Sequence, residues 1–389
     1  MKTIRDRLWE KAVQQRLPLT GAFELLPLCN LQCKMCYVRK TMGEVRAMGG
    51  LVPTEEWLDL ARQAQRLGTL FPLITGGEPF LHPDFQKILS EMLDMGMQAS
   101  VNTNGTLIDA SMAKFLSEHR PTRINMTLYG ASPETYEALC GDGNAYDRMR
   151  RGVELLKSYD IPLKFNTSIT PYNLKDMEAM IAFAKSVNSP VQVATYMFPP
   201  VRRDAAMVGH NDRLDPEQAG YARVLADWLQ NSPEWFQGQV RNFSHFMPVT
   251  EETFRNVPHE GRSMNCRAGR SSFWLDWQGN LGNCGMHSTV RCSVREHTME
   301  EAWKIVVEAT ENLRYAPACA SCPNSRICHA CMAMVHNECG GLQGRPEYLC
   351  KMNEASAKYY QEFARGGAPV PGAQAVFDRE NLECAVDPV

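Results

Sequence analysis

The chain has 389 residues with 41 basic and 44 acidic side chains, and a formal net charge of −3, so its overall charge gives no support for nucleic-acid binding. It has no apolar run long enough to cross a membrane and begins without the apolar core of a signal peptide, so we expect no membrane partner and a cytoplasmic location. Fourteen cysteines in a chain kept in a reducing compartment indicate metal ligands rather than disulfides.

Apolar residues follow a helical period and a strand period in alternation along the first part of the chain. Strands are expected over residues 23–28, 70–74, 98–102, 123–128, 162–169 and 191–196. Helices are expected over residues 4–16, 55–67, 84–95, 111–119, 133–139, 145–159, 174–186 and 215–229. Thr54 is the expected N-cap of the second of these helices, and Pro216 fits the first turn of the last one.

Six strands that alternate with helices imply parallel pairing through right-handed crossovers. A closed barrel of this kind has eight strands, so the pattern predicts an α/β fold with a partial (β/α)6 barrel. Motifs at the ends of the strands would then meet at one edge of the sheet, where such folds bind ligands. The expected parts are an N-terminal segment, the barrel, a bridging region, a cysteine-rich domain and a flexible tail, over residues 1–20, 21–225, 226–265, 266–365 and 366–389.

Cys29, Cys33 and Cys36 stand in a C-x3-C-x2-C pattern directly after the first predicted strand. Three thiolates on one loop can ligate three irons of a [4Fe–4S] cluster and leave the fourth iron open to a ligand that is not protein. A zinc site and plain buried thiols are the alternatives, although zinc favours paired C-x2-C spacing.

The second predicted strand ends in Thr75-Gly76-Gly77-Glu78-Pro79, and together with the cysteine triplet this motif resembles the radical S-adenosylmethionine (SAM) family. The resemblance implies that the triplet holds a [4Fe–4S] cluster whose open iron binds SAM. One electron then cleaves SAM to a 5′-deoxyadenosyl radical, which removes a hydrogen atom from the substrate. The resemblance also implies SAM contacts at Gly76, Gly77, Glu78, Pro79, Asn102, Asn104 and Thr127.

Each of these SAM contacts has a structural alternative. Gly76 and Gly77 fit an ordinary tight turn, and the polar residues fit caps at the ends of strands. The chain also departs from the family at one position, because Met35 stands where an aromatic residue often precedes the third cysteine, and Tyr37 follows that cysteine instead. The side chain that would face the adenine is therefore left open.

Nine further cysteines fall between residues 266 and 350. Seven of them resemble the SPASM extension of radical SAM enzymes, with one gap a residue shorter than usual. The resemblance implies two auxiliary [4Fe–4S] clusters, one held by Cys319, Cys322, Cys328 and Cys350 and the other by Cys266, Cys284 and Cys331. The fourth ligand of the second cluster is Cys292, Cys339 or an open iron, and a zinc ribbon is the alternative to both clusters. Cys140 and Cys384 are expected to be ordinary cysteines.

SPASM enzymes mostly modify peptides or proteins, so the resemblance implies oxidative bond formation in a ribosomally made peptide, as a cross-link or a thioether. The auxiliary clusters would take up the electron that the substrate radical loses, and a flavodoxin or ferredoxin would supply the electron that cleaves SAM. Only 28 residues precede Cys29, so recognition of a leader peptide is expected to need a separate protein or another surface of this one.

Two other functions stay open at this point. One is a sulfatase-maturase-like or cofactor-biosynthesis radical SAM oxidoreductase, although maturases carry an Asp base where Gly285 follows Cys284. The other is an iron–sulfur or zinc-binding scaffold or electron carrier that does not cleave SAM. The candidate bases or substrate contacts are Asp276, His287, Tyr196 and Arg202, each of which fits an ordinary solvated loop residue equally well.

Overall fold

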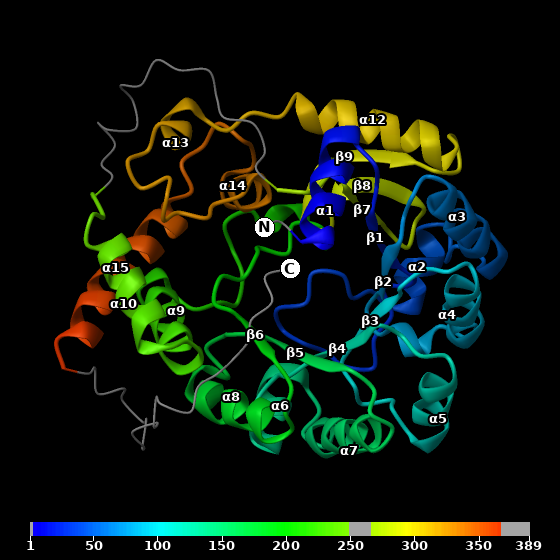
Figure 1. The fold of residues 1–389 in the computed structure, drawn as a ribbon, viewed down its shortest axis with the longest axis horizontal. Helices are drawn as coiled ribbons and strands as arrows, with labels where there is room; N and C mark the ends of the chain where they lie inside the picture. The colour runs from blue at the N-terminus through cyan, green and yellow to red at the C-terminus, as the bar shows by residue number, and fades with distance from the viewer. Residues whose placement is uncertain (1–2, 249–265, 367–389) are drawn as a thin grey trace.

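The computed structural model describes residues 3–248 and 266–366 and shows one curved sheet whose outer face is covered by helices (Figure 1). Within the described residues the sheet has nine strands, in the order β6-β5-β4-β3-β2-β1-β7-β8-β9. The six strands of the barrel pair in parallel: β1 Thr20–Glu24, β2 Phe71–Thr75, β3 Ser100–Thr103, β4 Arg123–Thr127, β5 Leu163–Ser168 and β6 Val191–Ala194. The predicted α/β partial barrel is therefore confirmed.

Helices connect these strands and pack against the outer face of the sheet (Figure 1). They are α3 Thr54–Arg66, α4 Phe85–Asp94, α5 Ala110–Glu118, α6 Pro133–Cys140, α7 Ala145–Ser158 and α8 Met177–Ser186. The outward side chains Val101, Ile124 and Phe165 are fully buried against them. The same strands carry polar residues at the alternate positions, so the hydrophobic core lies outside the barrel and the inner face stays polar.

The structure corrects two local predictions. The first strand begins at Thr20, three residues earlier than expected, and ends at Glu24, four residues earlier, because Thr20 and Gly21 pair with β2 although they carry no apolar pattern. Thr54 is not an N-cap: α3 begins at Thr54 itself after Pro53, and the Thr54 hydroxyl donates to Asp84 Oδ2 at 2.6 Å. The short elements α2 Met42–Ala47, η1 Pro79–Leu81, η2 Leu174–Asp176 and η3 Ala205–Met207 were not predicted.

The cysteine-rich region continues the sheet of the barrel. Strand β7 Ser272–Leu275 pairs in parallel with β1, and β8 Asn280–Cys284 and β9 His287–Ser293 extend the sheet as an antiparallel hairpin. Gly279 makes the turn between β7 and β8 at φ +81°, a value that favours glycine. The region predicted to begin at residue 266 therefore shares one sheet with the barrel, which it joins at Ser272.

The remaining helices surround the two ends of this sheet (Figure 1). They are α1 Ile4–Gln15, α9 Pro216–Gln230, α10 Pro233–Phe243, α12 Met299–Glu311, α13 Pro317–Ala320, α14 Met332–Cys339 and α15 Glu347–Ala364. Pro216 lies in the first turn of α9, as predicted. The Tyr360 ring of α15 packs against Phe236 and Phe243 of α10. No helix among the described residues is both long and apolar enough to cross a membrane.

Candidate active site

The loop that carries Cys29, Cys33 and Cys36 leaves the sheet at the carboxyl end of β1. Beyond the strand, the chain stays hydrogen-bonded to the loop after β2: the amides of Gly77 and Glu78 donate to the carbonyls of Leu26 and Leu28 at 2.7 and 2.8 Å. The two predicted motifs, which are far apart in the sequence, therefore lie against each other at one edge of the sheet.

The cysteine loop is also fastened on its other side to the end of α6. The amides of Gln32 and Lys34 donate to the carbonyls of Cys140 and Leu139 at 2.8 and 3.1 Å. Cys140 is thus part of the support of the loop, and a hydrogen bond with its thiol lowers the pKa of Cys33.

The sulfur atoms of this loop are surrounded by donors that suit thiolate ligands. The Leu31 amide lies 3.4 Å from Cys29 Sγ, and the Arg39 amide lies 3.2 Å from Cys36 Sγ. Burial raises the pKa of Cys29 to about 12, so this thiol needs a nearby positive charge such as iron to become a thiolate. The donor set fits an iron–sulfur cluster.

Positions 76 and 77 must be glycine because neither has room for a side chain. A Cβ at Gly76 would lie 2.6 Å from the carbonyl oxygen of Leu26, and a Cβ at Gly77 would lie 2.3 Å from that of Leu28. Both contacts are to backbone, which cannot move aside without shifting the cysteine loop. The glycines therefore set how closely the two motifs approach, and a contact with SAM comes in addition to this role.

Glu78 is enclosed by protein donors. Its carboxylate accepts hydrogen bonds from the Thr103 hydroxyl at 2.8 Å, the Asn104 amide at 2.7 Å and the Phe80 amide at 3.2 Å. Burial raises the pKa of Glu78 to about 7 against these hydrogen bonds. The side chain therefore ties the loop after β2 to the end of β3.

Asn104 connects the end of β3 to the cysteine loop. Its side-chain amide donates to Asn30 Oδ1 at 2.9 Å and lies 3.7 Å from Cys29 Sγ, while its carbonyl oxygen accepts from the Thr106 amide and hydroxyl. These partners fix the side chain, so Asn104 supports the site instead of standing free in it. Asn30 was not singled out in the sequence, where nothing marks it apart from its place in the loop.

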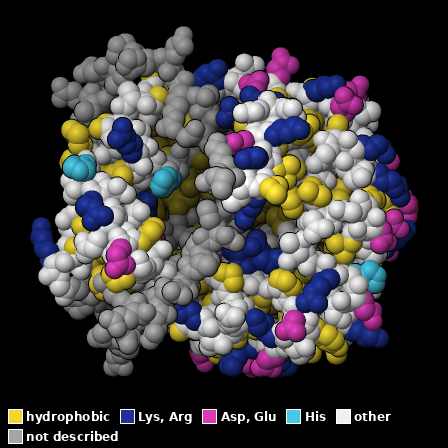
Figure 2. All heavy atoms as spheres, viewed as in Figure 1, with side chains coloured by type: hydrophobic (Ala, Val, Ile, Leu, Met, Phe, Trp, Pro, Cys, Tyr) yellow, Lys and Arg dark blue, Asp and Glu magenta, His cyan; other side chains and the backbone are white. Residues whose placement is uncertain are grey.

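Polar side chains cross the inner face of the barrel in two rows. Asn102, Asn125 and Lys164 are neighbours on β3, β4 and β5, and Asn125 donates to Asn102 Oδ1 at 2.9 Å. Thr127 and Asn166 begin the second row, nearer the carboxyl end. Lys and Arg side chains also border the hollow at the centre of the face shown in Figure 2. The interior can therefore hold a polar ligand beside the cysteine loop.

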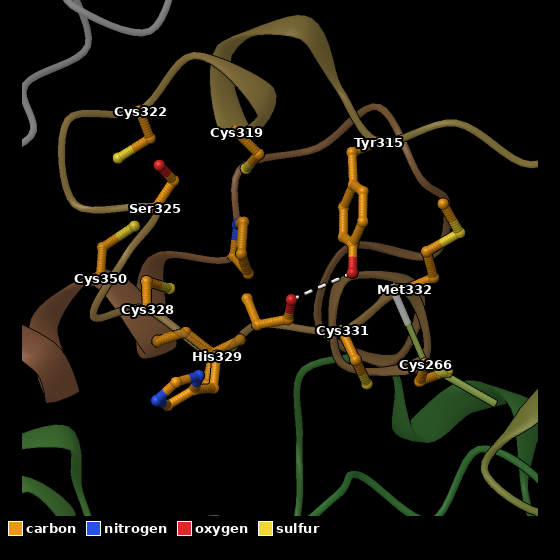
Figure 3. Close-up of a pocket in the computed structure, with 13 residues that line it drawn as sticks. Cys266, Tyr315, Cys319, Cys322, Ser325, Cys328, His329, Cys331, Met332 and Cys350 are labelled. Carbon is orange, nitrogen blue, oxygen red and sulfur yellow. Dashed lines mark hydrogen bonds between the residues drawn. The ribbon is translucent and has the colours of Figure 1, made fainter. Parts of the chain in front are cut away.

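The cysteine-rich region contains a cavity of about 280 Å³ lined by six of its cysteines (Figure 3). Burial and then the neighbouring thiols of Cys350, Cys328 and Cys322 raise the pKa of Cys319 to about 12. In Figure 3 these four sulfurs gather at one end of the cavity, and Cys331 lies at the other end beside Cys266.

Cys284 belongs to the second of these groups. Burial and then Cys284 and Cys266 raise the pKa of Cys331 to about 11, so these three thiols are close enough to interact. The structure thus brings the predicted cysteines together as a group of four and a group of three. Among the described residues no three ligands converge as a single metal ion would require, whereas a cubane cluster accepts more widely spaced sulfurs.

Neither described candidate for the fourth ligand lies with the group of three. Cys339 packs against Gly344, where a Cβ would lie 2.8 Å from its Sγ, and its electrostatic neighbours are Glu338, Cys350 and Glu347. Cys292 pairs with Leu281 across β8 and β9 and is buried in the main hydrophobic core. Cys384 lies outside the described residues.

The four candidate bases are all held by protein partners. Asp276 forms an ion pair with Arg291 at 2.8 Å and accepts backbone hydrogen bonds in the β7–β8 turn. His287 contacts Asn283 and Thr289 with its two ring nitrogens, and burial lowers its pKa to about 4. The other two candidates are also bonded, with the Tyr196 hydroxyl donating to Glu338 and the Arg202 guanidinium to Glu24.

Gly285 has a steric reason to be glycine. A Cβ at this position would lie 2.6–2.8 Å from three atoms of the Trp274 indole, and the Trp274 N–H donates to Glu24 Oε2 at 2.9 Å. Trp274 therefore fills the space in which a side chain after Cys284 would lie. Trp274 and Glu24 were not predicted as site residues, although a glutamate inside an apolar strand was a usable signal.

The structure thus defines an α/β partial barrel with a loop of three cysteines at the carboxyl edge of its sheet. Residues 23–184 match the model of the radical SAM superfamily. This part of the chain is therefore a radical SAM domain, and members of that superfamily bind SAM at a [4Fe–4S] cluster.

Three relatives illustrate the range of similar proteins. An AdoMet-dependent heme synthase of Methanosarcina barkeri is 23% identical over 338 residues, which cover 83% of this chain and 93% of that protein. A PqqA peptide cyclase of Granulibacter bethesdensis is 27% identical over 298 residues, or 74% of each protein. The crystal structure of Streptococcus suis SuiB bound to precursor peptide SuiA has a TM-score of 0.63 at 16% identity and covers 89% of this chain and 80% of SuiB. This last similarity is one of fold.

Proposed function

We propose that this enzyme modifies a ribosomally synthesised peptide by oxidative bond formation, as a cross-link or a thioether, and carries three [4Fe–4S] clusters. The observation that carries the proposal is the arrangement of the cysteines. A group of four and a group of three, in addition to the triplet, occur in one fold, in which the cysteine-rich region extends the sheet of the radical SAM domain. Two clusters beyond the SAM site suit a reaction in which the substrate radical loses an electron.

Cys29, Cys33 and Cys36 would hold the SAM-binding cluster, which supplies the 5′-deoxyadenosyl radical when it is reduced. The backbone of residues 76–79 would face the SAM amine, and Asn102 and Thr127 on the polar inner face would lie along the nucleoside and substrate. Glu78 and Asn104 would act indirectly, because their hydrogen bonds hold the surrounding loops in place.

In the cysteine-rich region, Cys319, Cys322, Cys328 and Cys350 would hold one auxiliary cluster and Cys266, Cys284 and Cys331 the other. The fold likeness to SuiB, which was crystallised with a precursor peptide, and the similarity to a PqqA peptide cyclase support a peptide substrate. A flavodoxin or ferredoxin would deliver the first electron, and a separate protein would bind the leader segment of the peptide.

A second candidate is a radical SAM oxidoreductase of cofactor biosynthesis. It is favoured by the AdoMet-dependent heme synthase, which this chain matches over 93% of that protein's length. A maturase-like reaction is less favoured, because Trp274 occupies the space that a base at position 285 would need.

The test is to sequence the genes that flank this one, co-express the protein anaerobically with each short open reading frame found there, and examine the encoded peptides by mass spectrometry. A loss of two hydrogens that depends on Cys29, Cys33 and Cys36 is the expected result. An unmodified peptide, together with SAM cleavage that increases when an iron porphyrin is added, would replace the peptide proposal with the cofactor candidate.

A further inference from the structure

Four residues that are distant in the sequence form a closed ring of contacts between the two cysteine-bearing parts of the fold. Arg202 donates to both carboxylate oxygens of Glu24, at 2.9 and 2.6 Å, and its Nη1 also donates to the carbonyl oxygen of Gly285 at 3.1 Å. The Trp274 indole donates to Glu24 and packs against Gly285, which closes the ring.

The ring lies between the SAM site and the group of three cysteines. Glu24 is the last residue of β1, from which the chain runs to Cys29, and Gly285 directly follows Cys284. The guanidinium of Arg202 also lies 5.6 Å from the ring centroid of Tyr37, the neighbour of Cys36. Through Glu24 and Tyr37 the ring contacts the part of the chain that carries the cysteine triplet, and through Gly285 it contacts the part that carries Cys284.

The charges in this ring are buried and have fixed directions. The side chains of Arg202 and Glu24 are 8% and 1% exposed, so water and salt screen them little. The guanidinium reaches the peptide after Cys284, whereas the carboxylate belongs to β1 and is also bonded to Trp274. The positive charge of the pair thus contacts the backbone next to Cys284 directly, whereas the carboxylate has no such contact.

We propose that Arg202 is a positioning residue that raises the reduction potential of the auxiliary cluster held at Cys284, with Glu24 as its counter-charge. The inference rests on the proposed function, because it requires a cluster at this site. One-electron reduction adds one negative charge to the cluster, and a buried cation on that side stabilises the reduced form. The cluster then becomes a better acceptor for the electron that the substrate radical loses.

The test is a redox titration of the full-length, anaerobically reconstituted protein with dithionite, followed by electron paramagnetic resonance. Cys284→Ala identifies the signal of the cluster concerned. In Arg202→Gln we expect the ratio of reduced to oxidised cluster at a fixed potential to fall about tenfold, equivalent to a downward shift of about 59 mV. In Glu24→Gln we expect a shift in the opposite direction, because the cation loses its counter-charge.

Arg213 and Glu338 provide a matched control. They form a second buried ion pair, with side chains 7% and 5% exposed, and have no described contact with the ring. Arg213→Gln should leave the potential of the Cys284 cluster unchanged. If Arg202→Gln fails to retain iron, Arg202→Lys keeps the charge with fewer hydrogen bonds and should keep the potential, while Glu24→Gln still tests the direction of the shift.

The outcomes separate this inference from the proposed function. Opposite shifts in Arg202→Gln and Glu24→Gln support it, whereas shifts in the same direction, or no shift with full iron content, overturn it. If Cys284→Ala and the wild-type protein contain the same amount of iron, the auxiliary site itself is wrong and both proposals fall.

Discussion

Gly77→Ala tests whether the close approach of the two motifs holds the cysteine loop in place. The new Cβ would lie 2.3 Å from the carbonyl oxygen of Leu28 and 2.9 Å from that of Pro27, so the backbone must separate. Overpacking of this kind costs about 1–3 kcal/mol. Separation would also weaken the two hydrogen bonds that Gly77 and Glu78 donate to the backbone just before the cysteine loop. Each of these bonds contributes about 0.5–1.5 kcal/mol.

The expected destabilisation is the sum of these terms, about 2–6 kcal/mol. For a slope of about 3 kcal/mol per molar urea, the unfolding midpoint measured anaerobically should fall by about 0.7–2 M. Gly43→Ala is the matched control, because its Cβ would meet nothing nearer than Thr41 Oγ1 at 3.9 Å. That variant should gain about 0.5–1 kcal/mol as an alanine in a helix. A Gly77→Ala midpoint within error of the wild type would refute the packing argument.

Three further variants test other parts of the site. Asn104→Ala removes several buried hydrogen bonds and should lower the unfolding free energy by about 2–4 kcal/mol. Asn102→Ala on the inner face of the barrel removes one hydrogen bond and should lower it by less than about 1 kcal/mol. Equal losses in urea unfolding would contradict this difference. Gly285→Ala should displace the Trp274 indole and change its fluorescence emission maximum, and an unchanged spectrum would show that the ring is not in contact. Cys319→Ala should lower the iron content from about twelve to about eight per chain, and full retention of iron would exclude this cysteine as a ligand.

The barrel could be predicted from the sequence because its strands and helices repeat a local pattern. Residues such as Val101, Ile124 and Phe165 alternate with polar neighbours, so the sequence of each strand indicates which of its faces packs against the helices. The hairpin β8–β9 was missed because its strands carry Asn, Gly, Cys and His in place of an apolar alternation. Thr54 was misassigned because Pro53 already supplies the extended residue that precedes the helix.

The grouping of the site residues was harder to predict, because it depends on which loops meet. The cysteine spacings were visible in the sequence. The separation of Cys339 and Cys292 from the group of three depends on their packing against Gly344 and pairing with Leu281, which the spacings do not indicate. Arg202 was singled out only as a candidate base or substrate contact, and its partner Glu24 lies 178 residues away. No periodicity reports a contact at that separation. The sequence indicated that Gly76 and Gly77 allow a close approach, but it could not show that the group they approach is the backbone of Leu26 and Leu28.

The central claim is that Cys29, Cys33 and Cys36 hold the cluster at which SAM is cleaved. The direct measurement is the release of 5′-deoxyadenosine from SAM by the anaerobically reconstituted, dithionite-reduced protein, with iron counted in the same samples. We predict release by the wild type and none by the variant in which all three residues are alanine, which should also contain about four fewer irons per chain. Undiminished release by the triple variant would contradict the account.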